Sequence, residues 1–174
     1  MANKAQMELR TKRCVLQPLE ADDAKSLHQL WSSAGVRRFL WDDEIIPMAR
    51  TVEAIEQSKR SFEERRFGLW GVTRHDAPDL IGFGGLWPFR EPPELELVFG
   101  VAEHVWGQGY ATEIAEAVTT YCFTSLAMPA VRASTDVANV ASIGVLEKLG
   151  FRFVRRDVVG GLDTVFYDLV GHTV

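Results

Sequence analysis

The chain has 174 residues, of which 47% are hydrophobic and 25% are charged, and its formal net charge is -5. This length and composition are typical of one globular domain, here 1–174, and they exclude a disordered or fibrous chain. The acidic balance disfavours nonspecific binding to nucleic acid, which requires clustered lysine and arginine, and it suits a cationic or neutral substrate better.

The sequence carries no signal for a membrane, a disulfide or a metal. Its apolar runs are shorter than the ~20 residues that span a bilayer, and the N-terminal segment lacks the apolar core of a secretory signal, so we expect a cytoplasmic protein. Cys14 and Cys122 fall in an expected strand and an expected helix and are interpreted as buried thiols. The histidines show no spacing that would hold a metal: His28, His75, His104 and His172.

The first part of the chain predicts one strand followed by three helices. Loose alternation indicates the strand, and the acidic pair Asp22-Asp23 is typical of a helix start. Val52, Ile55 and Phe62 follow a helical spacing. The expected elements are a strand at 8–17 and helices at 21–33, 36–41 and 51–65.

The second part predicts a sheet with two further helices. Turn-like composition at 75–78 and 90–93 separates three strand-like runs and favours an antiparallel meander, and Gly160-Gly161 favours a closing hairpin. The expected strands are 67–74, 79–87, 94–101, 131–137, 151–159 and 162–170, and the expected helices are 109–124 and 139–149. This order predicts an α+β fold, a mixed α/β sandwich.

A glycine loop lies between the expected strand at 94–101 and the helix that follows it. It reads Trp106-Gly107-Gln108-Gly109-Tyr110-Ala111-Thr112. Small residues let backbone amides approach a ligand closely, and the free N–H groups and dipole of a helix start attract phosphate. Tight packing alone would also explain the two glycines. The third glycine and acidic residue of a dinucleotide fold and the lysine of a Walker loop are missing, so another phosphate ligand is expected, and pyrophosphate fits best.

Several motifs together resemble the GNAT superfamily of acetyltransferases, and most closely its branch that acetylates ribosomal-protein N-termini. They are the strand Glu96–Val101, the segment Trp106–Glu113, the Asn139-Val140-Ala141-Ser142 start of a helix and Leu149-Gly150-Phe151. The resemblance implies a mostly antiparallel mixed sheet with helices on both faces, splayed between the strands at 94–101 and 131–137. Acetyl-CoA, the expected co-substrate, would enter the split.

The resemblance also assigns the residues that would hold acetyl-CoA. Backbone groups near Phe99 and Val101 would bond the pantetheine arm, and Asn139 and Ser142 would line the thioester end. The pyrophosphate would be held by Gly107, Gln108, Gly109, Tyr110, Ala111 and Thr112. Leu146 departs from the superfamily, which often has a tyrosine acid at that position, so Ser142 is expected to stabilise the departing thiolate.

Transfer to an amine requires a base, because a free alkylamine titrates near ~10. Glu96 matches the acidic position of the motif strand, and Glu94 lies two residues earlier on the same face. Either carboxylate would attract an ammonium group. The alternatives are that both glutamates lie on a solvated strand face, and that Asn139 and Ser142 form an ordinary helix N-cap.

Two tryptophans are candidates for the wall of an acceptor site. Trp41 precedes the acidic run Asp42-Asp43-Glu44, and Trp87 ends an expected strand. An aromatic wall with carboxylates attracts cationic amines, whereas large aromatics are more often core material, as is expected for Trp70.

The sequence therefore predicts an acyltransferase that moves acetyl from acetyl-CoA to a primary amine, either a protein N-terminus or a small molecule. A non-catalytic CoA-binding or sensing module is the first alternative, since Leu146 replaces the expected acid. A cofactor-free interaction domain is the second. No sequence feature favours or excludes a homodimer.

Overall fold

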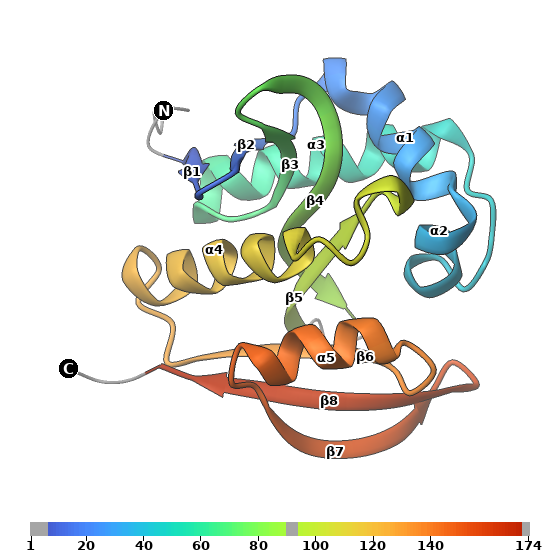
Figure 1. The fold of residues 1–174 in the computed structure, drawn as a ribbon, viewed down its shortest axis with the longest axis vertical. Coiled ribbons are helices and arrows are strands. Elements are labelled where there is room, and N and C mark those ends of the chain that lie inside the picture. The colour runs from blue at the N-terminus through green and yellow to red at the C-terminus, as the bar shows by residue number, and fades with distance from the viewer. Residues whose placement is uncertain (1–6, 90–93, 172–174) are drawn as a thin grey trace.

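An eight-stranded sheet runs through the computed structural model, which describes residues 7–89 and 94–171 (Figure 1). The strands are β1 (Leu9–Arg10), β2 (Cys14–Pro18), β3 (Leu69–Arg74), β4 (Ala77–Phe89), β5 (Glu94–Val101), β6 (Ala130–Asp136), β7 (Arg152–Val159) and β8 (Leu162–Val170). Their order in the sheet is β1-β2-β3-β4-β5-β6-β8-β7. Neighbouring strands are antiparallel except β5 and β6, which are parallel.

Helices cover both faces of this sheet, with α4 and α5 in front of the strands and α3 behind them in Figure 1. The helices are α1 (Ala24–Ser32), α2 (Ala34–Leu40), α3 (Met48–Arg65), α4 (Tyr110–Thr124) and α5 (Val140–Lys148), with short 3₁₀ helices η2 (Ala21–Asp23) and η3 (Glu103–Val105). The predicted α+β fold is confirmed. None of the helices within the described ranges is long and apolar enough to cross a membrane.

The structure corrects several predicted boundaries, of which three matter most. The strand expected at 8–17 is two strands, because the chain turns at Thr11, whose side chain accepts a bond from the amide of Cys14 at 2.9 Å. The helix expected from 51 begins at Met48, directly after Pro47. The turn expected at 75–78 is shorter, since β4 already starts at Ala77. The turn expected at 90–93 and His172 lie outside the described residues.

Glycines in β4 let α4 pack closely on the sheet. A Cβ added to Gly84 would lie 2.5 Å from Cγ2 of Ile114, and one added to Gly82 would lie 3.3 Å from Cδ1 of the same side chain. Trp70 is fully buried on this side, which confirms its expected place in the core. The two cysteines are likewise fully buried, as predicted.

The sheet opens between β5 and β6. Among the described residues these strands share a single pair of Cα partners, Glu96 and Arg132, whereas β4 and β5 pair along eight positions. Because β5 and β6 are parallel, their carboxyl ends lie on the same side of that pair, and there they diverge. The predicted split between 94–101 and 131–137 is confirmed.

Candidate active site

The β5 edge of the split presents backbone groups that are not used by the sheet. The amide of Ala102 donates to Ile81 of β4 at 2.8 Å, and the register along β4 and β5 is regular. Since backbone groups alternate in direction along an antiparallel strand, those of Phe99 and Val101 point away from β4, into the split. The Val101 carbonyl also accepts a bond from Nε1 of Trp106 at 2.9 Å. The geometry fits the contact expected for a pantetheine arm, and the contact itself stays a prediction.

The glycine loop leads directly into α4 at the open end of the split. Gly107 and Gly109 have φ angles of +71° and +83°, a backbone conformation that other residues adopt only with strain. The first intrahelical bond runs from the amide of Glu113 to the carbonyl of Gly109 at 3.1 Å. The amides of Tyr110 to Thr112 therefore precede the helical bond ladder and are oriented to bind an anion.

The second helix start at this end is that of α5, and it has an N-cap. Asn139 Oδ1 accepts a bond from the amide of Ser142 at 3.2 Å, so the capping interpretation of these two residues is confirmed. Contact of either residue with a thioester stays a prediction. Leu146 is 1% exposed and packs in the main apolar cluster, so the position lacks a hydroxyl and cannot protonate a thiolate.

Glu96 lies inside the protein, at the narrow end of the split. Its side chain is 1% exposed, and Oγ of Ser134 on β6 donates to Oε2 at 2.5 Å. In the sheet register it stands opposite Trp87 of β4. The solvated-face alternative is therefore wrong for Glu96, because its side chain is almost completely shielded from solvent. A carboxylate so deeply buried requires hydrogen-bonding partners, and Ser134 is one of them.

Glu94 is part of an ionic group that ties β5 to β8 through β6. Arg132 Nη1 contacts Glu94 at 3.2 Å, and its Nε and Nη2 contact the carboxylate of Asp168 at 3.0 and 3.4 Å. Bonding to Asp168, and then to Glu94, raises the pKa of Arg132 above its ordinary value. Glu94 therefore has a structural role, and its attraction of an acceptor stays a prediction.

Trp41 lies at the end of α2, and the acidic loop that follows it faces the end of β6. The ring of Trp41 packs edge-on against Trp31 at a centroid distance of 5.3 Å. Asp42, which follows, has a φ angle of +52°. Burial, and then the charge of Asp42, raises the pKa of Asp136, the last residue of β6. Trp41 and Trp87 pack against the same apolar cluster, so the two predicted wall residues share one face of the sheet.

Three site residues on β6 were missed by the sequence analysis. Arg132, Ser134 and Asp136 occupy every second position and are partly exposed, whereas Val131 and Ala133, which point to the other face of β6, are buried. A period of two with one polar side is the pattern of a strand that exposes one face to a polar environment. This signal is present in the sequence, although the partners Glu94 and Glu96 come from a distant segment.

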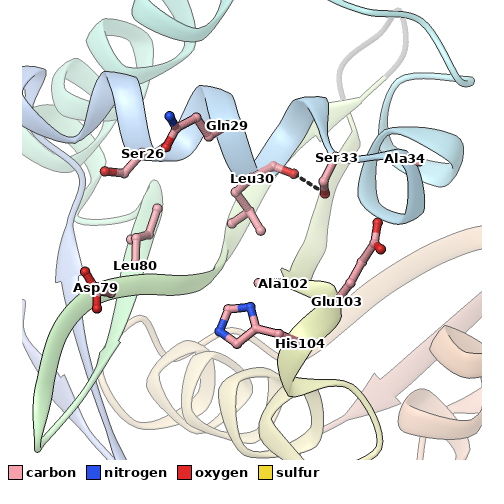
Figure 2. Close-up of a pocket in the computed structure, with 10 residues that line it drawn as sticks. All are labelled: Ser26, Gln29, Leu30, Ser33, Ala34, Asp79, Leu80, Ala102, Glu103 and His104. Carbon is pink, nitrogen blue, oxygen red and sulfur yellow. Dashed lines mark hydrogen bonds between the residues drawn. The ribbon is translucent and has the colours of Figure 1, made fainter.

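A separate groove of about 650 Å³ lies outside the split, between α1, β4 and η3 (Figure 2). Its lining residues are Ser26, Gln29, Leu30, Ser33, Ala34, Asp79, Leu80, Ala102, Glu103 and His104. Glu103 reaches from η3 to the start of α2, where Oε1 accepts a bond from the amide of Gly35 at 2.7 Å. The Trp106 ring lies so close to Gly35 that an added Cβ would be 2.3 Å from it. The start of α2 is thereby fastened to the segment before the glycine loop.

A smaller cavity of about 210 Å³ lies between α3 and the ends of β4 and β5. Trp87 and Leu95 line it from the sheet, and Ser61 and Arg65 are among the residues that line it from α3. Trp87 therefore lines this cavity, and its role as a wall of an acceptor site stays a prediction.

Comparison with known proteins identifies the family. Residues 13–152 match the family model described as acetyltransferase (GNAT) domain. The chain belongs to the GNAT family. It is an acetyl-CoA-dependent acetyltransferase, and its structure confirms the resemblance in the sequence motifs.

Two relatives with similar sequences are bacterial acetyltransferases. The uncharacterised N-acetyltransferase YoaA of Bacillus subtilis (strain 168) is 26% identical over 145 residues, which are 83% of this chain and 82% of that protein. The spermidine N(1)-acetyltransferase of Escherichia coli (strain K12) is 25% identical over 136 residues, 78% of this chain and 71% of that protein.

Two solved structures share the fold. An acetyltransferase from Agrobacterium tumefaciens str. C58 has a TM-score of 0.82 at 21% identity and covers 94% of both chains. RimL, a ribosomal L7/L12 alpha-N-protein acetyltransferase solved in complex with coenzyme A, has a TM-score of 0.78 at 14% identity, covering 94% of this chain and 97% of that one.

Proposed function

We propose that this GNAT enzyme transfers acetyl from acetyl-CoA directly to a primary amine that approaches from the face of the sheet carrying Glu96. The observation that carries the proposal is the split itself, with two helix starts at its open end and a buried, hydrogen-bonded carboxylate at its narrow end. The two helix starts favour the phosphates of the co-substrate, and the carboxylate favours the amine.

Acetyl-CoA is proposed to complete the sheet at the point where β5 and β6 part. Its pantetheine amides would pair with the outward backbone groups of Phe99 and Val101, as an added strand does. Its pyrophosphate would bind the amides of the loop from Gly107 to Thr112. The thioester would then lie near Glu96, with Asn139 and Ser142 beside it.

Amine activation is assigned to Glu96 acting through Ser134. The ammonium group first loses one proton to solvent, and the neutral amine nitrogen then attacks the thioester carbonyl carbon, so that the C–N bond forms and the C–S bond breaks with the thiolate leaving. The amine proton passes to Oγ of Ser134, which hands its own proton to Oε2 of Glu96, its partner at 2.5 Å. Glu96 is too deeply buried to contact the acceptor directly. Ser134 is only partly buried, so its hydroxyl can contact the amine and pass the proton on to the carboxylate of Glu96.

Stabilisation of the leaving thiolate is assigned to Ser142 and to the start of α5. Leu146 offers no proton, so the negative charge on sulfur is stabilised by the Ser142 hydroxyl and by the positive end of the helix dipole.

The cysteines play no part as nucleophiles. Both are fully buried, and burial raises the pKa of Cys14 and raises that of Cys122 to about 12, so neither forms a thiolate at neutral pH.

The acceptor is proposed to be a cationic amine, either a protein N-terminus or a small molecule. Asp42, Asp136 and Glu94 place carboxyl groups on the acceptor face, which is the face of the sheet that carries Glu96, and the rings of Trp41 and Trp87 lie on that same face. Such a surface attracts ammonium groups. The named activities of the spermidine and ribosomal-protein acetyltransferases among the relatives and structural neighbours support both acceptor classes.

A turnover assay with a panel of amines tests the proposal. The protein is incubated with acetyl-CoA and with polyamines, amino acid amides or short peptides with free N-termini, and release of free thiol is followed. We expect at least one cationic amine to raise thiol release far above hydrolysis, and Glu96→Gln to abolish most of that rise. Binding of acetyl-CoA without turnover of any amine would leave a CoA-binding module and contradict the proposed enzyme.

A further inference from the structure

The glycine loop is clamped from outside by a residue of the β1–β2 turn. Arg13 Nε and Nη2 each contact the carboxylate of Glu113 at 2.7 Å, and Nη1 donates to the carbonyl of Gln108 at 2.9 Å. The guanidinium carbon lies 4.1 Å from the ring centroid of Tyr110. One side chain thus contacts the loop, the first residue of α4 and the fourth residue of α4.

The bond to the Gln108 carbonyl fixes the direction of an amide that the loop needs. In a planar trans peptide the carbonyl and the following N–H point in opposite directions. With its carbonyl bonded to Arg13, the Gln108–Gly109 peptide must present the N–H of Gly109 on the side away from Arg13. Without that bond, the two positive-φ glycines of the loop would leave this peptide free to rotate.

The contact with Arg13 compensates the negative charge of Glu113, which lies close to the proposed pyrophosphate site. Glu113 lies in the first turn of the helix whose start is proposed to bind pyrophosphate, so its carboxylate would repel that ligand if it were unpaired. Its oxygens instead accept bonds from Oγ1 of Thr11 at 2.5 Å and from the amide of Arg13 at 2.8 Å, besides the guanidinium. Burial alone would raise the pKa of Glu113, but these bonds outweigh it and lower the pKa.

We infer that Arg13 is a positioning residue for the co-substrate: it holds the glycine loop in its anion-binding form and cancels the charge of Glu113, so that the loop accepts a diphosphate. The inference rests on the proposed function of the loop. Arg13 touches neither the reacting atoms nor the acceptor face. Its effect should therefore appear in the binding of donors that carry a diphosphate and be absent for donors that lack one.

The experiment compares acetyl-CoA with acetyl-pantetheine, which has the same thioester and arm but no diphosphate. For Arg13→Ala we expect KM for acetyl-CoA to rise about tenfold or more, the effect of losing about 1.4 kcal/mol of binding. The kcat and the KM for acetyl-pantetheine should stay near the wild-type values. Arg10→Ala is the matched control, because Arg10 also lies by the β1–β2 turn but is exposed and paired with Glu8.

Two further variants distinguish the effect of the Arg13 charge from the effect of its hydrogen bond to the Gln108 carbonyl. Arg13→Lys keeps the charge but lacks the planar fork, so its KM for acetyl-CoA should fall between those of the wild type and Arg13→Ala. In Arg13→Ala/Glu113→Gln the unpaired carboxylate is gone, so part of the lost affinity for acetyl-CoA should return.

These variants and donors distinguish failure of the proposed function from failure of the proposed role of Arg13. Wild-type protein that binds no acetyl-CoA in calorimetry would overturn the proposed function. Wild-type protein that binds it, with Arg13→Ala equally tight or with both donors weakened alike, would overturn the role of Arg13. A double variant no better than Arg13→Ala would overturn its charge-cancelling part. Melting temperatures of all variants are measured in parallel, and the double variant serves as the decisive protein if Arg13→Ala unfolds.

Discussion

The environment of Glu96 depends on the residues that pack around it and cannot be predicted from its residue type. Glu96 is almost fully buried, yet a strand reading ELELV is just as typical of a solvated glutamate, and only the neighbouring strand decides between the two. Ser134 of that strand donates a hydrogen bond to the buried carboxylate and is proposed to connect it to the amine. The two residues lie 38 positions apart in the chain, so no local pattern links them.

Removing the Ser134 hydroxyl should separate Glu96 from the amine. For Ser134→Ala we expect kcat to fall about 10²-fold, a typical contribution of a positioned proton acceptor. KM for acetyl-CoA should change little, because β6 is not part of the glycine loop. Ser134→Thr keeps a hydroxyl and should recover most of kcat. Unchanged kcat in Ser134→Ala across the pH profile would exclude the relay.

Replacing Asp136 by asparagine should raise the stability of the protein and weaken its binding of a cationic acceptor. Burial and the charge of Asp42 raise its pKa, so its ionised form is disfavoured in the folded state. The carboxyl is neutral in both states at low pH, and as pH rises through the folded-state pKa the folded protein loses stability relative to the unfolded chain. Asp136→Asn should therefore be more stable than the wild type at pH 7, by less than about 1 kcal/mol, and equal to it near pH 3.

The same variant should bind a cationic acceptor less tightly, because it removes a negative charge from the acceptor face. Denaturant unfolding at the two pH values and KM for the best amine test the two effects separately. A variant that is destabilised at pH 7 would contradict the assigned cause.

Among the elements, the glycine loop with α4 was predicted most completely from the sequence. Its small residues, its helix start and its place after a strand are all local features, and the structure reproduces each of them. The clamp from Arg13 could not be predicted in the same way, because the contact joins segments about a hundred positions apart. The signal for it was indirect: an acidic residue in the first turn of a helix whose start is proposed to bind phosphate would repel that ligand unless a cation lay nearby.

Gly109→Ala should damage both the backbone and the binding site. A residue with a Cβ at φ +83° costs about 1–2 kcal/mol of stability, and the loop relaxes by moving its amides. We expect a lower melting temperature and a higher KM for acetyl-CoA.

Gly161→Ala provides the matched comparison. Gly161 has a φ of +85° in the β7–β8 turn, with no atom within 4 Å of an added Cβ. It should lose similar stability and keep a wild-type KM. If the two variants had the same KM, the loop conformation would have no bearing on co-substrate binding.

At the scale of the whole molecule, the sequence predicted the order of the elements and the split, and it missed what joins the two sides. The order follows from local periodicity and turn residues, and the split follows from the resemblance to GNAT proteins. The links across the split are ionic and hydrogen-bonded contacts between β5, β6 and β8, such as Arg132 with Glu94 and Asp168. Such pairings depend on strand register, which composition does not encode.

Because one pair of Cα partners joins β5 to β6, the two parts of the sheet should behave as separate units in hydrogen exchange. In the free protein we expect amides of β6 and β8 to exchange at a different rate from those of β3 and β4. Acetyl-CoA should slow exchange at Phe99 and Val101 most. Uniform protection of all strands in the absence of co-substrate would contradict this expectation.

The buried Leu146 has a consequence for donor chemistry. An enzyme with an acid at this position protonates the sulfur as the bond breaks, and its rate depends less on how basic that sulfur is. With Leu146 at this position the sulfur is proposed to depart as an anion, so we expect the logarithm of the rate to vary linearly with the acidity of the thiol in a series of acetyl thioesters. A steep slope in such a leaving-group plot would be the kinetic signature of a leucine in place of a proton donor.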